Sequence, residues 1–256
     1  MCELQEVIMN IILKKTKKLA AIMIIIIASM ALHGCQNDTK IIEQADRYYE
    51  TKKYKEALDL YFSVYEKGHS GTEKKIANIY YEQLDYAEAA KWYRKAANQG
   101  DADAQFNLGV MYNKGHGVQQ DYAEAAKWYK KAADQGYAKA QYNLGIIYYE
   151  GYGVPQDYAE AAKLFKKAAD QGLAEAQCNL GAMYDKGYGV PQDYAEAVKW
   201  YRKAADQGFS QAQFNLGVMY NNGQGVPQDY AEAAKWLKKA ADQGDKDAIE
   251  ALKRFR

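Results

Sequence analysis

The stretch DYAEAVKWYRKAADQG, residues 193–208, decides the fold, because close copies of it recur along the chain. Its opening tetrapeptide, Asp-Tyr-Ala-Glu, returns every 36 residues. The copies begin at Asp85, Asp121, Asp157, Asp193 and Asp229. Self-similarity at a fixed period of roughly 20–50 residues is typical of solenoid repeats. The repeating unit therefore has to be interpreted before any single motif.

The second half of each unit is predicted to be a helix with marked ends. In residues 121–136, Asp121 can cap the helix and Glu124, three residues later, completes a capping-box pattern. Gly136 is placed to end the helix, because glycine adopts the left-handed conformation without strain. One apolar face is formed by Tyr122, Ala125, Ala126, Tyr129 and Ala133. Recurring tryptophans on these helices are interpreted as packing residues: Trp92, Trp128, Trp200 and Trp236.

The first half of each unit is predicted to be a second helix. Ala104, Leu108 and Tyr112 form an apolar stripe, and Gly115 and Gly117 end the helix in a loop. Neither helix can bury its stripe alone, so the two must pack as an antiparallel hairpin and stack on their neighbours. No strand pattern interrupts this alternation. The fold class is therefore predicted to be all-α.

A glycine in the middle of each first helix points to close packing. Gly109 recurs as Gly145, Gly181 and Gly217, although glycine costs a helix about 1 kcal/mol relative to alanine. We expect each glycine to let the paired helix approach, with a small residue such as Ala125 facing it. An asparagine recurs unchanged in each first helix, and we expect its side chain to form a hydrogen bond with nearby backbone. These asparagines are Asn107, Asn143, Asn179 and Asn215.

Together these positions resemble the Sel-one-like subclass of tetratricopeptide-like repeats, whose pattern residues 102–244 match four times. The resemblance implies a right-handed α-solenoid of antiparallel hairpins. The segment before it has a 32-residue spacing from Tyr54 to Tyr86 and lacks the Gly-x-Gly-Val loop, so its two hairpins look like plain tetratricopeptide units. The expected hairpins are 41–67, 72–98, 102–134, 138–170, 174–206 and 210–242, followed by a capping helix over 246–255.

If the resemblance holds, the first helices line a concave groove that binds an extended peptide or a partner helix. The groove residues it implies are Phe106, Val110, Asn113, Tyr142, Ile146, Tyr149, Phe214, Val218 and Asn221. In the third matching unit Cys178, Ala182 and Asp185 take the same positions. The alternative is that this surface is only a solvated groove.

The N-terminus has the pattern of a secretory signal. Lysines at 14, 15, 17 and 18 precede an apolar run, residues 19–32, which falls short of the roughly 20 residues that span a bilayer. Leu32, Gly34 and Cys35 resemble a bacterial lipobox, which implies lipidation of Cys35. The domains are therefore predicted as a signal peptide (1–34), a polar tether (35–40) and a repeat solenoid (41–256). An uncleaved anchor is the alternative, and Met9 competes with Met1 as the start.

The position of the lysines directs the repeats across the membrane. Gln36 after the cysteine resembles outer-membrane sorting, so we expect a membrane-anchored lipoprotein of the bacterial envelope, on the periplasmic face of the outer membrane. The leader carries four lysines and two glutamates, which leaves 30 basic and 31 acidic side chains after it. This balance provides no electrostatic footprint for nucleic acid.

No pattern of catalytic or metal-binding residues stands out. The four serines have no lysine three residues on, and His69 and His116 lie in different interhelical segments. Some relatives carry paired cysteines and are linked to β-lactam hydrolysis, but Cys178 is unpaired after the leader. We therefore predict a non-enzymatic scaffold without metal or cofactor. Its expected partner is a protein or peptide, with peptidoglycan-associated proteins among the candidates. A β-lactam- or peptidoglycan-related hydrolase is the alternative, and a secreted effector is a third.

Overall fold

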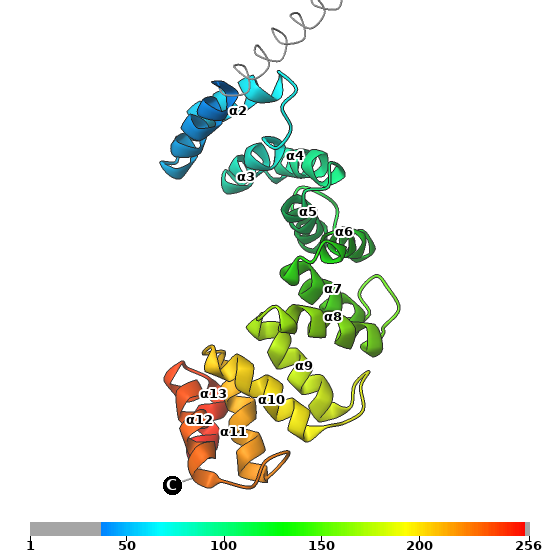
Figure 1. Cartoon of the computed structure of the whole chain (residues 1–256), viewed down its shortest axis with the longest axis vertical. Coiled ribbons are helices and arrows are strands. Elements are labelled where there is room, and N and C mark those ends of the chain that lie inside the picture. Colours follow the sequence, from blue (N-terminus) through cyan, green and yellow to red (C-terminus); the bar gives the residue numbers. More distant parts are fainter. Residues whose placement is uncertain (1–36, 254–256) are drawn as a thin grey trace, which may run out of the picture. The chain divides into compact units, whose positions relative to one another are not determined.

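The computed structural model describes residues 37–253, and every regular element in that range is an α-helix (Figure 1). The chain divides into two compact units, of which unit 1 ends at Gln83 and unit 2 begins at Leu84. Each unit is described by itself. The predicted all-α fold is confirmed, whereas the predicted signal peptide and Cys35 lie outside the described residues.

Unit 1 contains the helical residues 37–50, then α2 (Tyr54–Tyr65) and α3 (Glu73–Glu82), which packs against α2. Tyr61 and Ile76 are fully buried between these helices. Tyr61 donates a hydrogen bond to Asp46 (2.5 Å), and Lys75 pairs with the same carboxylate (2.5 Å). The unit is thus held by an apolar centre with a charged pair at its edge.

The predicted tether differs from the structure in its described part, since residues 37–40 are helical. Asp38 is only 5% exposed, and its carboxylate contacts Lys67 Nζ and His69 Nε2, each at 2.6 Å. The hydrogen bond from Lys67 lowers the pKa of Asp38. These contacts fasten the start of the described chain to the end of α2. Polar composition alone did not reveal them.

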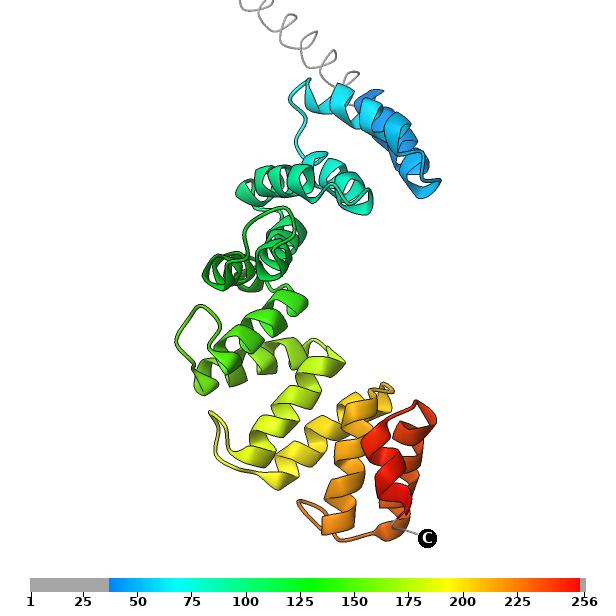
Figure 2. The same ribbon diagram turned by 180° about the vertical axis from the view of Figure 1, so that it is seen from behind.

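Unit 2 is a solenoid in which each helix packs on the helices before and after it in sequence (Figures 1 and 2). Its helices are α4 (Tyr86–Asn98), α5 (Ala102–Lys114), α6 (Tyr122–Asp134), α7 (Ala138–Glu150), α8 (Tyr158–Asp170), α9 (Ala174–Lys186), α10 (Tyr194–Asp206), α11 (Ser210–Asn222), α12 (Tyr230–Asp242) and α13 (Lys246–Lys253). The hairpins predicted from residue 102 to residue 242 are confirmed. The predicted hairpin 72–98 spans both units, so its packing stays a prediction. Residues 254 and 255 of the predicted cap lie outside the described range.

The second helix of each hairpin begins where its aspartate predicts. Asp121 accepts a hydrogen bond from the backbone N–H of Glu124 (2.9 Å), and Asp157 does the same for Glu160 (2.9 Å). The glutamate side chain does not complete a reciprocal capping box here. Glu124 instead binds Lys127 (2.8 Å) and the indole N–H of Trp128 (3.0 Å). In the recurring Asp-Tyr-Ala-Glu sequence, the aspartate therefore caps the helix start. The glutamate side chain binds the tryptophan four residues later.

The mid-helix glycines do allow close approach, but the facing residue is larger than we expected. A Cβ placed on Gly109 would lie 2.6 Å from the ring of Tyr129, and one on Gly145 would lie 2.7 Å from Phe165. The same positions face Tyr201 and Leu237 in the last two hairpins. An aromatic or leucine side chain, not alanine, therefore packs on each glycine.

A ladder of buried glutamines joins successive hairpins and was not anticipated from the sequence. Gln177 donates to the carbonyl oxygen of Ala169 (3.1 Å) and accepts from Gln207 Nε2 (2.8 Å). The other rungs repeat this arrangement, and the four glutamines are 4–5% exposed: Gln105, Gln141, Gln177 and Gln213. Each rung satisfies polar groups at the end of one second helix and ties that end to the next hairpin.

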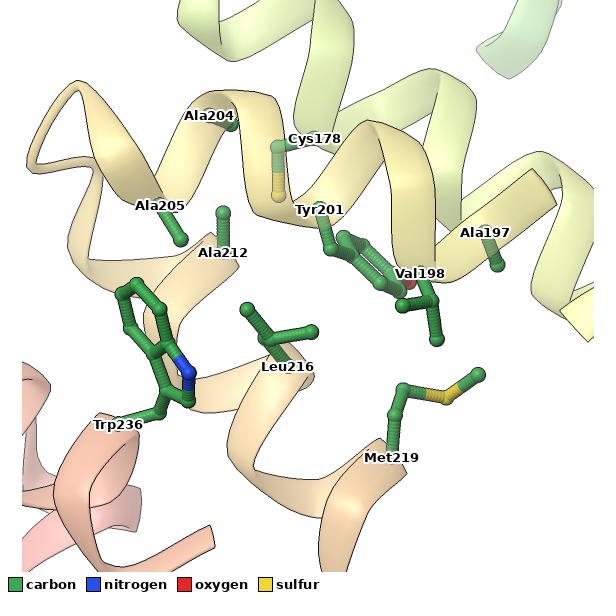
Figure 3. Packing of buried hydrophobic residues seen from close by; sticks show 10 residues of the cluster. All are labelled: Cys178, Ala197, Val198, Tyr201, Ala204, Ala205, Ala212, Leu216, Met219 and Trp236. Atoms are coloured by element: carbon green, nitrogen blue, oxygen red, sulfur yellow. The ribbon is translucent and has the colours of Figure 1, made fainter. Parts of the chain in front are cut away.

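The core between hairpins is built from small and aromatic side chains, as Figure 3 shows for α9 to α12. Tyr201 from α10 lies beside Leu216 and Met219 from α11, and Trp236 from α12 closes the cluster. The four tryptophans are 5–8% exposed, so their interpretation as packing residues is confirmed. Lysine amines lie over their rings, 3.6–3.9 Å from the centroids.

Candidate partner-binding groove

Hollows recur at one register of the repeat, between the first helices of successive hairpins. Three lie in unit 2, and we name them the α5–α7, α9–α11 and α11–α13 pockets, with volumes of about 240, 550 and 600 Å³. The floor of each is the residue seven positions after the start of the second helix: Tyr129, Tyr201 or Leu237. A shift of 72 residues carries the lining of the α5–α7 pocket onto the α9–α11 pocket, and a shift of 36 carries most of the α9–α11 lining onto the α11–α13 pocket. The surface is therefore a series of equivalent hollows.

The α5–α7 pocket is neutral and amide-rich. Asn113 and Asn143 line it beside the aliphatic side chain of Ile146. Tyr122 and Tyr152 stack on one another at its edge, with ring centroids 5.2 Å apart. A pocket of this composition can hold an apolar side chain of a ligand, while the asparagine amides form hydrogen bonds with polar groups next to that side chain.

The α9–α11 and α11–α13 pockets share a wall, because Phe214 and Val218 line both of them. The first is polar, with Asp185 among its lining residues. The second has Asn221 and Asn222 on one side and Asp247 and Glu250 on the other. These two hollows are therefore neighbours at the C-terminal end of unit 2.

Unit 1 has its own hollow, of about 350 Å³, at the corresponding register, since Tyr61 is the residue seven positions after the start of α2. It is far more charged than the α5–α7 pocket. Its lining comprises Asp46, Tyr49, Glu50, Tyr61, Lys74, Lys75 and Asn78. The same architecture thus presents different chemistry in the two units.

The structure places many of the predicted groove residues in these hollows. Asn113 and Ile146 line the α5–α7 pocket, and Phe214, Val218 and Asn221 line the α11–α13 pocket. All nine residues are half-buried. Phe106, Val110, Tyr142 and Tyr149 line none of the pockets described above, and whether any of the nine residues binds a partner stays a prediction.

The predicted aromatic strip is wedged between hairpins more deeply than a free binding strip would be. Phe106 packs on Tyr129 and Tyr137, with centroid distances of 5.8 and 5.1 Å. Tyr142 packs on Phe165 at 5.7 Å, and burial raises its pKa. These rings therefore contribute to stability as well as to the groove surface.

Tyr149 lies within a cluster of tyrosines. Its ring meets Tyr158 edge-on at 5.1 Å and lies 6.4 Å from Tyr188, which itself stacks on Tyr158 at 5.0 Å. Asn113, Asp185 and Asn221 hold the equivalent position in the other hairpins. An aromatic side chain thus occupies this step of the groove.

Cys178 differs from the aromatic residues of its series because it is only 4% exposed. Burial raises the pKa of its thiol to about 12, although the nearby Asn215 amide acts in the opposite direction. Asn215 Nδ2 lies 3.9 Å from the sulfur. Burial likewise raises the pKa of Tyr129 to about 12, opposed by Asn143. Asn143 and Asn215 therefore interact with side chains of the preceding hairpin, whereas we expected bonds to nearby backbone.

The contacts of the tyrosines at the groove edge could not be predicted from the sequence. The sequence pattern places Tyr122 on the apolar face of its helix, and Tyr158 and Tyr194 hold the equivalent position. In the structure the first two stack on loop residues of the following hairpin, as Tyr86 does on His116 (4.5 Å). An aromatic ring directly follows the first loop glycine at His116, Tyr152 and Tyr188, and this recurrence could have indicated the contacts.

The described residues offer no constellation for metal or nucleophilic chemistry. Within residues 37–253 no group of three or more histidine, cysteine or acidic side chains could hold a metal ion. His69 contacts Asp38, and His116 stacks on Tyr86, so the histidines lie in separate units. In the same range, no helix combines the length and apolarity that a bilayer crossing requires.

The stacked hairpins and their equivalent pockets define a helical-repeat protein. The Sel1 repeat family model matches residues 55–101, 102–137, 138–173, 174–209 and 210–245, and the chain belongs to this family. The match at 55–101 gives one Sel1 repeat more than the four predicted. Proteins of this family are scaffolds for protein–protein interaction and are typically non-enzymatic.

Two solved structures are similar over most of the chain. One is a protective antigen present in uropathogenic Escherichia coli strains, which is 37% identical with a TM-score of 0.80. That match covers 84% of this chain and 48% of the antigen, so the chain spans about half of its length. The other is a Sel1 repeat protein from Oxalobacter formigenes, 35% identical with a TM-score of 0.74, covering 83% of this chain and 86% of that one. A search of curated proteins gave no match.

Proposed function

We propose that this chain is a bacterial envelope lipoprotein whose repeats bind a protein or peptide partner in the groove between their first helices. The recurrence of hollows at one register carries the proposal, because it provides equivalent binding positions along consecutive hairpins. The residues lining them vary between repeats, while the residues packing beneath them hardly change. Variation above a constant core is what a specific recognition surface requires.

The groove is sized for side chains of an extended partner. Hollows of about 240 to 600 Å³ with aromatic, aliphatic and amide walls suit inserted side chains with polar groups beside them. Peptidoglycan-associated proteins are candidate partners because the proposed location exposes the repeats to the periplasm. No observation of the described residues favours the hydrolase alternative over this scaffold function.

Groove function is tested by cross-linking the protein in intact envelopes, recovering it and identifying its partners by mass spectrometry. Tyr142→Ala combined with Tyr149→Ala should remove most partner recovery, because we propose that both rings contact the partner. The matched control is Lys130→Ala combined with Lys166→Ala, which removes exposed side chains from second helices. Undiminished recovery in the tyrosine variant, with the fold intact by circular dichroism, would place the partner elsewhere.

Anchoring is proposed at Cys35, from the basic run, the short apolar stretch and the Leu-x-Gly-Cys ending. Outer-membrane sorting and periplasmic exposure follow from the same segment. Radiolabelled palmitate should enter the wild-type protein and be absent from Cys35→Ser. Equal label in both proteins would exclude lipidation at this cysteine, without affecting the groove proposal.

A further inference from the structure

The α9–α11 pocket contains a carboxylate where the equivalent positions are uncharged. Asp185 stands at the position of Asn113, Tyr149 and Asn221, and its side chain is only 17% exposed. A largely buried carboxylate is costly unless a positive group or several hydrogen-bond donors satisfy it. The equivalent positions of the neighbouring repeats carry no charge.

The partner that Asp185 has within the protein is weak. Lys186, the adjacent residue, approaches Asp185 Oδ2 at 3.2 Å, but its side chain is 61% exposed. Exposed pairs of this kind contribute little, because water solvates the amine and screens the interaction. An incoming cation that excludes water from the pocket could replace Lys186 at small cost.

The walls of the pocket suit a planar cation. Tyr194 and Phe214 line it as half-buried rings together with Asp185, whereas the Tyr201 ring is only 2% exposed. Asp185 lies close enough to the Tyr201 phenol to contribute, after burial, to raising the pKa of that group. Aromatic faces attract cations, and guanidinium groups both stack on rings and bond carboxylates through two N–H groups. The amides of Asn215, Asn222 and Gln224 line the same pocket and can meet polar groups beside the cation.

We infer that the α9–α11 pocket binds an arginine side chain of the partner peptide, with Asp185 as its counter-charge. The inference rests on the proposed groove function and names the partner's chemistry at one step of it. The pocket volume of about 550 Å³ accommodates the side chain and the flanking backbone. The neutral α5–α7 pocket, by contrast, provides no charge for such a group.

The probe for this inference is N-acetyl-L-arginine amide, titrated into the purified protein and followed by ¹⁵N nuclear magnetic resonance. Saturable shifts should centre on Asp185, Tyr194 and Gln224. The uncharged N-acetyl-L-glutamine amide should bind about tenfold more weakly, as expected for loss of a charge-assisted hydrogen bond. Equal binding of the two probes, or no saturable shift with arginine, overturns the inference.

Asp185→Asn is the decisive variant, because asparagine occupies this position in α5 and α11 and should preserve the fold. It should weaken arginine binding about tenfold and abolish the preference over glutamine. The matched control is Asp206→Asn, which removes the same charge from an exposed position at the end of α10. An equal loss in the control would show general electrostatics and overturn the site.

Two further outcomes separate this inference from the groove proposal. If arginine fails to bind while the tyrosine double variant still loses its envelope partner, the groove function stands and the arginine assignment falls. If arginine binds at Asp185 but partner recovery never depends on groove residues, the pocket is an arginine site and the groove proposal falls.

Discussion

The two helices of each hairpin in unit 2 do different work, and their comparison separates stability from recognition. Second helices present alanines and large side chains to the core, such as Trp128 and Tyr129 in α6 and Trp200 and Tyr201 in α10, which are 1–7% exposed. First helices present half-buried residues such as Val110 and Asn221 toward the groove. The buried positions barely change between repeats, whereas the groove positions range from phenylalanine to aspartate. A solenoid can diversify one face because the other face holds the stack together.

The largest expected effect comes from truncating a second-helix ring. Tyr201→Ala should lower the free energy of unfolding by about 3–5 kcal/mol, because it leaves a cavity beside Leu216 and beneath Gly181. Chemical denaturation measures this loss. The groove truncation Tyr142→Ala, at a half-buried ring, should cost clearly less. An equal loss of unfolding free energy in the two variants would contradict the assignment of stability mainly to the second helices.

Overpacking a hairpin should have the next largest effect. Gly145→Leu places a side chain where even a Cβ would lie 2.7 Å from the Phe165 ring, so we expect a loss of about 1–3 kcal/mol or more. Thermal unfolding by circular dichroism measures it. A raised melting temperature would mean that helix propensity outweighs packing here, because glycine at an open helical position is improved by substitution.

Removing a rung of the glutamine ladder should cost about 0.5–1.5 kcal/mol for each hydrogen bond lost. Gln177→Ala removes the bonds to the Ala169 carbonyl and from the Gln207 amide, each of which keeps one other hydrogen bond. Lys199→Ala, in an exposed pair with Glu196, is the control and should change stability little. Denaturant midpoints of both variants test whether the ladder stabilises the contact between hairpins.

High pH should destabilise the core in a predictable direction. Burial raises the pKa of Cys178 from its ordinary 9.0, and that of Tyr129 from 10.0, to about 12 in each case. The unfolded state therefore ionises first, so the stability from these neutral groups is complete below pH 9 and is lost as the pH rises toward 12. Cys178→Ala should reduce the loss in pH-dependent unfolding curves. An unchanged curve would mean that the thiol does not contribute.

The smallest effect is expected at the groove amides. Asn221→Ala should change the free energy of unfolding by no more than about 0.5 kcal/mol, because the residue lies half-buried on the pocket wall. Melting temperature measures this change. A loss comparable to that of Gln177→Ala would show that the groove wall is itself structural, and would weaken its assignment to recognition.

The sequence by itself determined the period, the helix bounds and the capping. These features depend on local chemistry. The capping role of Asp121 and the unusual helical position of Gly109 can each be recognised from a few neighbouring residues. The family resemblance indicated the register of the groove, and Asn113, Ile146, Phe214, Val218 and Asn221 line its pockets, because a repeat fixes equivalent positions once one hairpin is understood. Cys35 and the anchor remain predictions from local pattern alone.

Only the tertiary structure decided which groups meet across hairpins. The partners of Gln177 and Asp38 lie about 30 residues away in sequence, and the ring facing Gly145 comes from another helix. The half-burial of Tyr142 and the tyrosine cluster around Tyr149 likewise depend on how neighbouring hairpins pack. The repeat spacing shows that two positions are equivalent. It does not show how deeply neighbouring residues bury the side chain at each position. The degree of burial depends on how the hairpins pack, and this packing buries most of the Asp185 side chain.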